Sequence, residues 1–193
     1  MTRRLRWWLA GILVMAIHVP ALARISPQSA YDAGMKAFNK GDYGRSVESF
    51  STVIWYCIDE KLKTGVPMEP EDFAMGSTAY VYRGVSYLKR GQAGKAETDF
   101  AQAEKWGGQS ARIRLMIGEA YFRVGRYDDS IKALLPLVDA DPNLGMAQNY
   151  LARSYYMKRD YASSWKHAKE AQKLGIPVTA LIGKLKKAAP EHE

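Results

Sequence analysis

The chain has 193 residues, of which 47% are hydrophobic and 25% charged, with 28 Lys+Arg against 20 Asp+Glu. This apolar content excludes a disordered tail, and the length suits one domain with a sizeable core. One cysteine and three histidines exclude an internal disulfide, a paired-cysteine metal site and a multi-histidine metal site.

The first 23 residues have the layout of a secretory signal peptide. Three arginines within the first six residues precede an apolar run over residues 7–19, and the segment closes with PALA. Ala21 and Ala23 fit an A-x-A cleavage site, so we predict cleavage after Ala23 and a mature chain that starts at Arg24. The apolar run is shorter than the roughly 18 residues that a spanning helix needs, so an uncleaved membrane anchor is the lesser alternative. The expected location is the periplasm or, after full secretion, the medium.

The predicted mature chain is only mildly basic. Removing the three arginines of the leader leaves 25 Lys+Arg residues against 20 Asp+Glu. Together with export, this small excess argues against a nucleic-acid partner.

A 34-residue period organises the rest of the chain. The recurring columns are Gly84, Gly118 and Ala152; Tyr87, Tyr121 and Tyr155; and Phe100, Leu134 and Ala168. An upstream copy around Gly34 and Phe50 is displaced by 50 residues, so an insertion over residues 61–76 separates it from the next copy. Apolar residues follow helical spacing within each copy. Two helices are expected per copy, with the break at Gly41, Gly91, Gly125 and Arg159.

The third copy carries the clearest pattern. It reads ARIRLMIGEAYFRVGRYDDSIKALLPLVDADPNL, with small Gly118, aromatic Tyr121 and a closing Asp141-Pro142. In these columns the chain resembles the tetratricopeptide repeat (TPR) family, whose unit is a 34-residue helix-turn-helix. The resemblance implies an all-α, right-handed superhelical solenoid of four helix pairs, because one pair alone cannot bury its apolar face. The expected repeats are residues 27–60, 77–110, 111–144 and 145–178, within a repeat domain over 24–178.

Two further helical segments are predicted outside the regular period. Residues 52–58 are β-branched and aromatic and alone would indicate a strand, but the repeat register places them on a helix that we expect to extend to about Lys63. A helix start is expected at Pro70, since proline and acidic residues suit a first turn. Residues 179–193 are expected to form a capping helix and a tail.

The sequence offers no catalytic or cofactor-binding motif. It contains no glycine-rich phosphate loop, no GxSxG elbow and no HxE…CxxC arrangement. We expect His167 to be a surface or partly packed residue. Cys57 is expected to be a small core residue, with an intermolecular or redox role as the lesser alternative. No enzymatic activity, cofactor or metal is predicted.

The predicted binding surface is the inner wall, formed by the first helix of each copy. A stripe at i, i+4 and i+7 on these helices should face a groove, with basic residues beside it. The predicted groove residues are Tyr31, Met35, Phe38, Val81, Val85, Leu88, Lys89, Arg112, Leu115, Glu119, Phe122, Arg123, Asn149, Arg153 and Tyr156. This apolar ladder with basic flanks favours a segment that is apolar with acidic residues, bound as a helix or extended peptide. The alternative for Phe38, Leu88 and Phe122 is packing between adjacent first helices.

The sequence therefore predicts an exported, non-enzymatic scaffold or adaptor that binds another envelope or secreted protein. Some members of the resembled family hold the C-terminal carboxylate of a chaperone with Lys and Asn on these stripes. Tyr31, Met35 and Val85 occupy those places here, so that activity is not carried over. Two alternatives stay open: a structural oligomer whose groove is filled by a second copy, and a small-ligand carrier or enzyme with a pocket inside the superhelix.

Overall fold

The computed structural model describes residues 26–108 and 110–192, and the regular elements in these ranges are all helical. The predicted signal peptide and its cleavage point at Ala23 and Arg24 lie outside the described residues. Four helix pairs follow one another: α1 (Pro27–Asn39) with α2 (Tyr43–Ile54), α4 (Pro70–Lys89) with α5 (Ala93–Trp106), α6 (Ala111–Arg123) with α7 (Tyr127–Ala140), and α8 (Gly145–Met157) with α9 (Tyr161–Lys173). The helix α10 (Thr179–Ala188) and a short 3-10 turn η2 (Pro190–His192) complete the chain.

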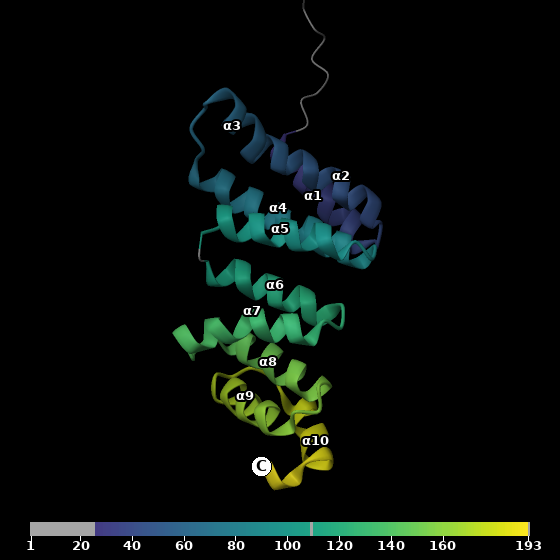
Figure 1. Cartoon of the computed structure of the whole chain (residues 1–193), viewed down its shortest axis with the longest axis vertical. Coiled ribbons are helices and arrows are strands. Elements are labelled where there is room, and N and C mark those ends of the chain that lie inside the picture. The colour runs from purple at the N-terminus through teal and green to yellow at the C-terminus, as the bar shows by residue number, and fades with distance from the viewer. Residues whose placement is uncertain (1–25, 109, 193) are drawn as a thin grey trace, which may run out of the picture.

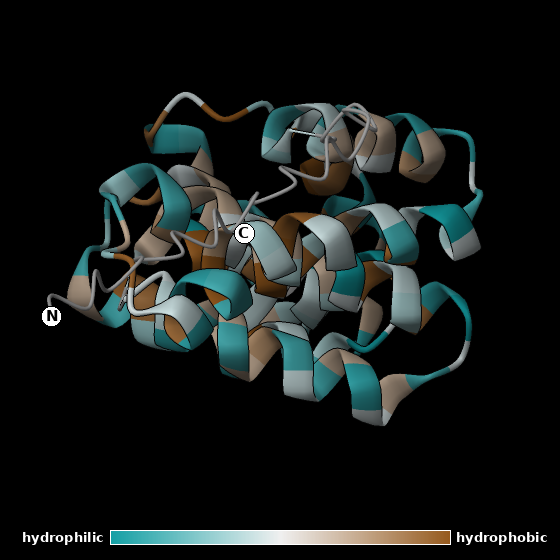
Figure 2. Ribbon diagram, turned by 90° about the horizontal axis from the view of Figure 1, so that it is seen from above, coloured by the Kyte–Doolittle hydropathy of each residue, from teal (hydrophilic) through white to brown (hydrophobic). Residues whose placement is uncertain are grey.

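The pairs stack along the long axis of the molecule, and α10 lies at the C-terminal end of the stack (Figure 1). The arrangement confirms the predicted all-α helical solenoid. Seen from above, hydrophobic residues gather toward the middle of the stack and hydrophilic residues lie on its outer turns (Figure 2). The first helices of the repeats are α1, α4, α6 and α8, and we call the surface that they form the first-helix face.

Each pair turns at one residue with a left-handed backbone. Gly41, Gly91 and Gly125 have φ values of 76°, 73° and 80°, and Arg159 adopts a φ of 63° at the fourth turn. The backbone N–H of Asp160 then donates to the carbonyl of Tyr155 at 3.0 Å, as Gln92 does to Tyr87 at 2.9 Å. Arg159 therefore forms the same turn as the glycines, despite the steric cost of its Cβ.

The insertion lengthens two helices around a short loop. The second helix continues through a π-helical turn, η1 (Trp55–Asp59), and α3 (Glu60–Thr64), and it ends at Gly65 with a φ of 72°. After the loop, Glu69 and Asp72 form a reciprocal capping box at the start of α4. An ion pair between Lys61 and Asp72 joins the two extended ends. The helix α4 thus begins at Pro70, where a helix start was expected, and the predicted repeat start at residue 77 lies within it.

The core is built where second helices meet the glycines of first helices. Phe50 of α2 lies against Gly34, Phe100 of α5 against Gly84, and Leu134 of α7 against Gly118. All three large side chains are buried. At the C-terminal end, Leu185 of α10 is buried and the indole Nε1 of Trp165 donates to the carbonyl of Ala189 at 2.9 Å. The last helix is therefore docked on the final repeat and closes its apolar side.

In the described part of the chain, none of the helices combines the length and the apolar character needed to cross a lipid bilayer.

Candidate functional site

Three hollows lie along the first-helix face. The N-terminal hollow, of about 300 Å³, is lined by Gln28, Tyr31, Glu71, Ala74, Met75, Thr78 and Arg112. The middle hollow, of about 210 Å³, is lined by Met35, Phe38, Asn39, Val81, Tyr82, Val85, Met116, Glu119, Ala120 and Arg123. The C-terminal hollow, of about 320 Å³, is lined by Phe122, Asn149, Arg153, Tyr156, Met157, Pro177, Val178, Ala180, Leu181 and Lys184.

The predicted groove residues divide among these hollows. Two line the N-terminal hollow: Tyr31 and Arg112. Six line the middle hollow: Met35, Phe38, Val81, Val85, Glu119 and Arg123. Four line the C-terminal hollow: Phe122, Asn149, Arg153 and Tyr156. Leu88, Lys89 and Leu115 line none of the three. The contact of these residues with a ligand stays a prediction.

The expected apolar ladder is broken at α4. Val81 and Val85 are only 1% and 8% exposed, because α4 packs against α1, α2, α5 and α6. Leu88 packs on the same core, and Leu115 packs on the cluster around Leu134. Val81 and Val85 therefore present little surface to a ligand, while Leu88 and Leu115 are half-buried. The first-helix face has separate hollows, and contact of the predicted ladder with a ligand stays a prediction.

The middle hollow is apolar with its charges already neutralised. The Nη2 atom of Arg123 lies 2.6 Å from Oε1 of Glu119, one helical turn away. Burial, followed by a hydrogen bond with Glu119, raises the pKa of the Tyr150 hydroxyl. Phe38 packs edge-on against Tyr82, with ring centroids 5.3 Å apart. This hollow is suited to an apolar side chain.

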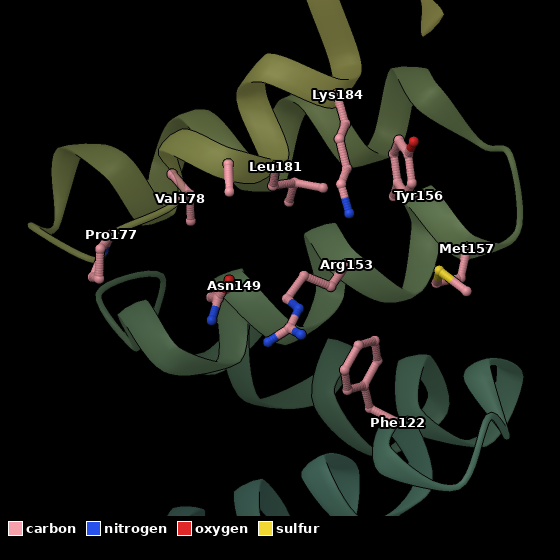
Figure 3. Close-up of a pocket in the computed structure, with 10 residues that line it drawn as sticks. Phe122, Asn149, Arg153, Tyr156, Met157, Pro177, Val178, Leu181 and Lys184 are labelled. Carbon is pink, nitrogen blue, oxygen red and sulfur yellow. The ribbon is translucent and has the colours of Figure 1, made fainter.

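The C-terminal hollow has the opposite electrostatic character. The guanidinium of Arg153 lies over the ring of Phe122, 4.5 Å from its centroid. The ammonium of Lys184 and the amide of Asn149 share this hollow (Figure 3). Its ten lining residues include no Asp and no Glu. The hollow therefore offers cationic and amide donors beside apolar walls.

Several lining residues escaped the sequence reasoning. Met116 and Met157 lie beside the predicted stripes and line the middle and C-terminal hollows. Val178, Leu181 and Lys184 belong to α10 and the residue before it, a segment that the sequence indicated only as a cap. Periodicity identifies the apolar face of α10, but the angle at which this helix returns has no signal in the repeat pattern.

A further hollow, between α5, α6 and α7, lies on the side of the second helices. It is lined by paired charges: Arg126 bonds Glu97 at 3.0 Å and Asp129 at 2.6 Å. The Arg126 guanidinium also lies 4.9 Å from the ring centroid of Tyr121. Since these charges satisfy one another across the repeat boundary, we assign them a structural role.

His167 and Cys57 are both buried, and neither has a catalytic neighbour among the described residues. His167 is 5% exposed, which corrects the expectation of a surface or partly packed residue. The Nε2 amide of Gln148 donates to the carbonyl of Pro142, which fixes the orientation of the side-chain amide. The Oε1 atom of Gln148 therefore accepts a hydrogen bond from Nδ1 of His167, with the two atoms 2.7 Å apart. The imidazole also stacks on Tyr155, with ring centroids 5.5 Å apart. Burial lowers the pKa of His167 and raises that of the Cys57 thiol to about 11.

The described ranges contain no group of three or more His, Cys, Asp or Glu side chains that could hold a metal ion.

Comparison with known proteins agrees with the geometry. Residues 115–176, from within α6 to just beyond α9, match the family described as tetratricopeptide repeat. No curated protein sequence matches the chain. A solved structure titled "MamA MSR-1 C2" is similar at 16% identity and a TM-score of 0.51, over 87% of this chain and 93% of that one. A second, titled "Crystal structure of MamA protein", has 17% identity and a TM-score of 0.44, over 78% of this chain and 92% of that one.

The family match covers the last two helix pairs, and the first of these structural similarities extends the fold over most of the chain. Stacked repeats of this kind present extended surfaces that serve as scaffolds for protein–protein interaction. Residues 115–176 thus carry tetratricopeptide repeats, within a longer stack of helix pairs.

Proposed function

We propose that the chain is an exported, non-enzymatic scaffold that binds a peptide or helix of another envelope or secreted protein along the first-helix face. The observation that carries the proposal is which helices line the three hollows. Every residue that lines the three hollows comes from a first helix, from α10 or from the two residues before α10. A ligand on this face would therefore contact successive repeats, as helix-in-groove and extended-peptide binding both require.

The stack supports the proposal because it presents this face in a fixed form. Each first helix contacts the next one, and large buried side chains lock the pairs together. A preorganised surface loses little conformational entropy when it binds a ligand. The ordering cost then falls mainly on the bound segment.

The chemistry of the hollows supports a ligand that is apolar with acidic residues. The middle hollow is apolar and its Glu119–Arg123 pair is internally balanced. The C-terminal hollow adds two cations and no anion. A segment with an apolar residue and an acidic residue at the matching spacing would complement both.

Site-specific photo-crosslinking in living cells tests the proposal. A photoreactive residue at Met157, which is exposed on the C-terminal hollow, should capture one discrete protein of the envelope or medium. The same residue at Ala162, exposed on α9 and outside the hollows, is the matched control. Equal capture from both positions would contradict the proposal. Capture of a second copy of the chain from Met157 would replace it with the self-associating oligomer.

Export is tested separately. The layout of residues 1–23 supports cleavage after Ala23, so the protein recovered from the periplasm or medium should have an intact mass that begins at Arg24. A mass that retains Met1, in the membrane fraction, would instead establish the anchored form.

A further inference from the structure

The C-terminal hollow has walls from two parts of the fold. Arg153 stands on α8 and Lys184 on α10, the helix that docks on the last repeat. In Figure 3 the Lys184 side chain extends from α10 toward α8, and the Arg153 guanidinium lies between Asn149 and Phe122. The two cations thus approach one hollow from opposite sides.

Arg153 and Lys184 have no carboxylate partner in the described ranges, unlike the arginines of two other first helices, Arg83 and Arg123. Arg83 bonds Asp99 and Arg123 bonds Glu119, in each case with N–O distances below 3 Å. Arg153 instead contacts the faces of two rings: its guanidinium carbon lies 4.5 Å from the centroid of Phe122 and 6.0 Å from that of Tyr150. A guanidinium held by its face keeps its N–H edge available to a carboxylate.

The apolar walls extend on both sides of Arg153. Phe122 of α6 lies on one side, and Val178 and Leu181 lie on the other, beside Lys184. A bound chain would find apolar contacts before and after the cations. This arrangement suits an acidic side chain with apolar neighbours on both sides of it in the segment.

Given the peptide-binding role proposed above, we propose that the C-terminal hollow is the subsite for an internal Asp or Glu side chain of the bound segment. The carboxylate lies between Arg153 and Lys184, and a neighbouring apolar residue packs on Phe122 or Leu181. The helix α10 is then part of the binding site as well as the cap of the repeat stack.

The test uses peptides selected from a random displayed library against the protein purified after export. The selected peptides are synthesised with an amidated C-terminus and a fluorophore, and their affinities are measured by fluorescence anisotropy. We expect the library to enrich Asp or Glu beside an apolar residue. R153Q and K184Q should each weaken binding by about tenfold, since a charge-assisted contact is lost. Both side chains are exposed, so the variants should keep the fold, which circular dichroism checks.

The matched control is K187Q, which removes the same charge from an exposed position of α10 outside the hollow. It should leave the affinity unchanged. A charge exchange adds a direct readout: K184E should recover affinity for a peptide in which the selected acidic residue is replaced by lysine.

Three results would overturn the subsite. These are enrichment of apolar residues without acidic ones, equal effects of K184Q and K187Q, or binding only by peptides with a free C-terminal carboxylate. Each leaves peptide binding on the first-helix face intact. Failure of every peptide, amidated or free, to bind the protein would contradict the proposed function as well.

Discussion

Single side chains decide how closely neighbouring helices approach in this stack. In the first three repeats a glycine faces a large residue, and a Cβ added at Gly118 would lie 2.4 Å from Cγ of Leu134. In the fourth repeat the corresponding residues are Ala152 and Ala168, both fully buried. The glycine and the large side chain are therefore complementary in volume. In the fourth repeat, where alanine takes the place of the glycine, alanine also takes the place of the large residue.

The substitution G118A should destabilise the protein by about 1–3 kcal/mol, because the new methyl overpacks a filled contact. The double variant G118A/L134A recreates the Ala–Ala pair of the fourth repeat. It should cost clearly less than the sum of the two single variants, measured by urea unfolding as a double-mutant cycle. Additive costs would mean that the two positions are not coupled through this contact.

Buried serines join adjacent repeats in the same way. Ser130 and Ser154 lie with their hydroxyl oxygens 3.1 Å apart, and Ser46 and Ser86 lie 2.9 Å apart. At the boundary between the second and third repeats the corresponding positions are Ala96 and Ala120. At each boundary, therefore, both residues are serine or both are alanine. Since Ser86 also donates to the carbonyl of Tyr82 at 2.8 Å, the two serine pairs differ in what remains when one hydroxyl is removed.

S130A should therefore cost about 1 kcal/mol of unfolding free energy, because it leaves the Ser154 hydroxyl buried without its partner. S46A should cost less, since Ser86 keeps its bond to Tyr82. The double variant S130A/S154A should recover much of the loss. Equal costs for S130A and S46A in urea unfolding would show that the second bond of Ser86 contributes nothing.

The extended second helix of the first repeat shows what one extra residue in a helical turn does to a face. Trp55 at the start of the π-turn η1 is 46% exposed, while Cys57 and Ile58 are buried. Sequence register placed this aromatic and β-branched run on a helix, against its strand-like composition. The π-turn had no signal in the repeat register, because its extra residue per turn departs from the regular helical period.

The environment of Cys57 makes a chemical prediction. Burial raises the pKa of the thiol to about 11, so the thiol is protonated at pH 8 and sheltered from solvent. Ellman's reagent should label the folded protein slowly and the protein in guanidinium chloride rapidly. Rapid labelling of the folded protein, or a disulfide-linked dimer after export, would support the redox or intermolecular role instead.

The burial of His167 between α8 and α9 predicts that stability depends on pH. Burial holds His167 neutral in the folded protein with a lowered pKa, whereas the unfolded chain binds a proton near pH 6.5. The unfolded state therefore binds more protons as pH falls below about 7, and stability decreases toward pH 5. Urea unfolding at pH 7.5 and 5.5 should show a smaller loss for H167Q than for the natural chain. An equal loss would place the pH sensitivity elsewhere.

Over the whole molecule, the sequence period was sufficient for the repeat architecture but not for the surface. The columns of Gly118, Tyr121 and Leu134 give the helix pairs because each column has one packing role. They do not give the angles between repeats or the return of α10. Those angles leave Val85 only 8% exposed and place Lys184 and Arg153 on opposite sides of one hollow. The sequence predicted the helix α10, but only the three-dimensional arrangement shows that its residues line a hollow.

Methyl NMR of methionine tests most directly whether the first-helix face binds a protein segment. Met35, Met75, Met116 and Met157 line the three hollows, whereas Met68, in the loop before α4, lines none of them and serves as the internal control. The ligand is the segment captured by crosslinking from Met157, added as a synthetic peptide to the protein with ¹³C-methyl methionine. We predict shifts of the methyl signals of Met157 and of Met35 or Met116, with that of Met68 unchanged. A shift confined to Met68, or no shift at a peptide concentration that saturates binding, would contradict the account.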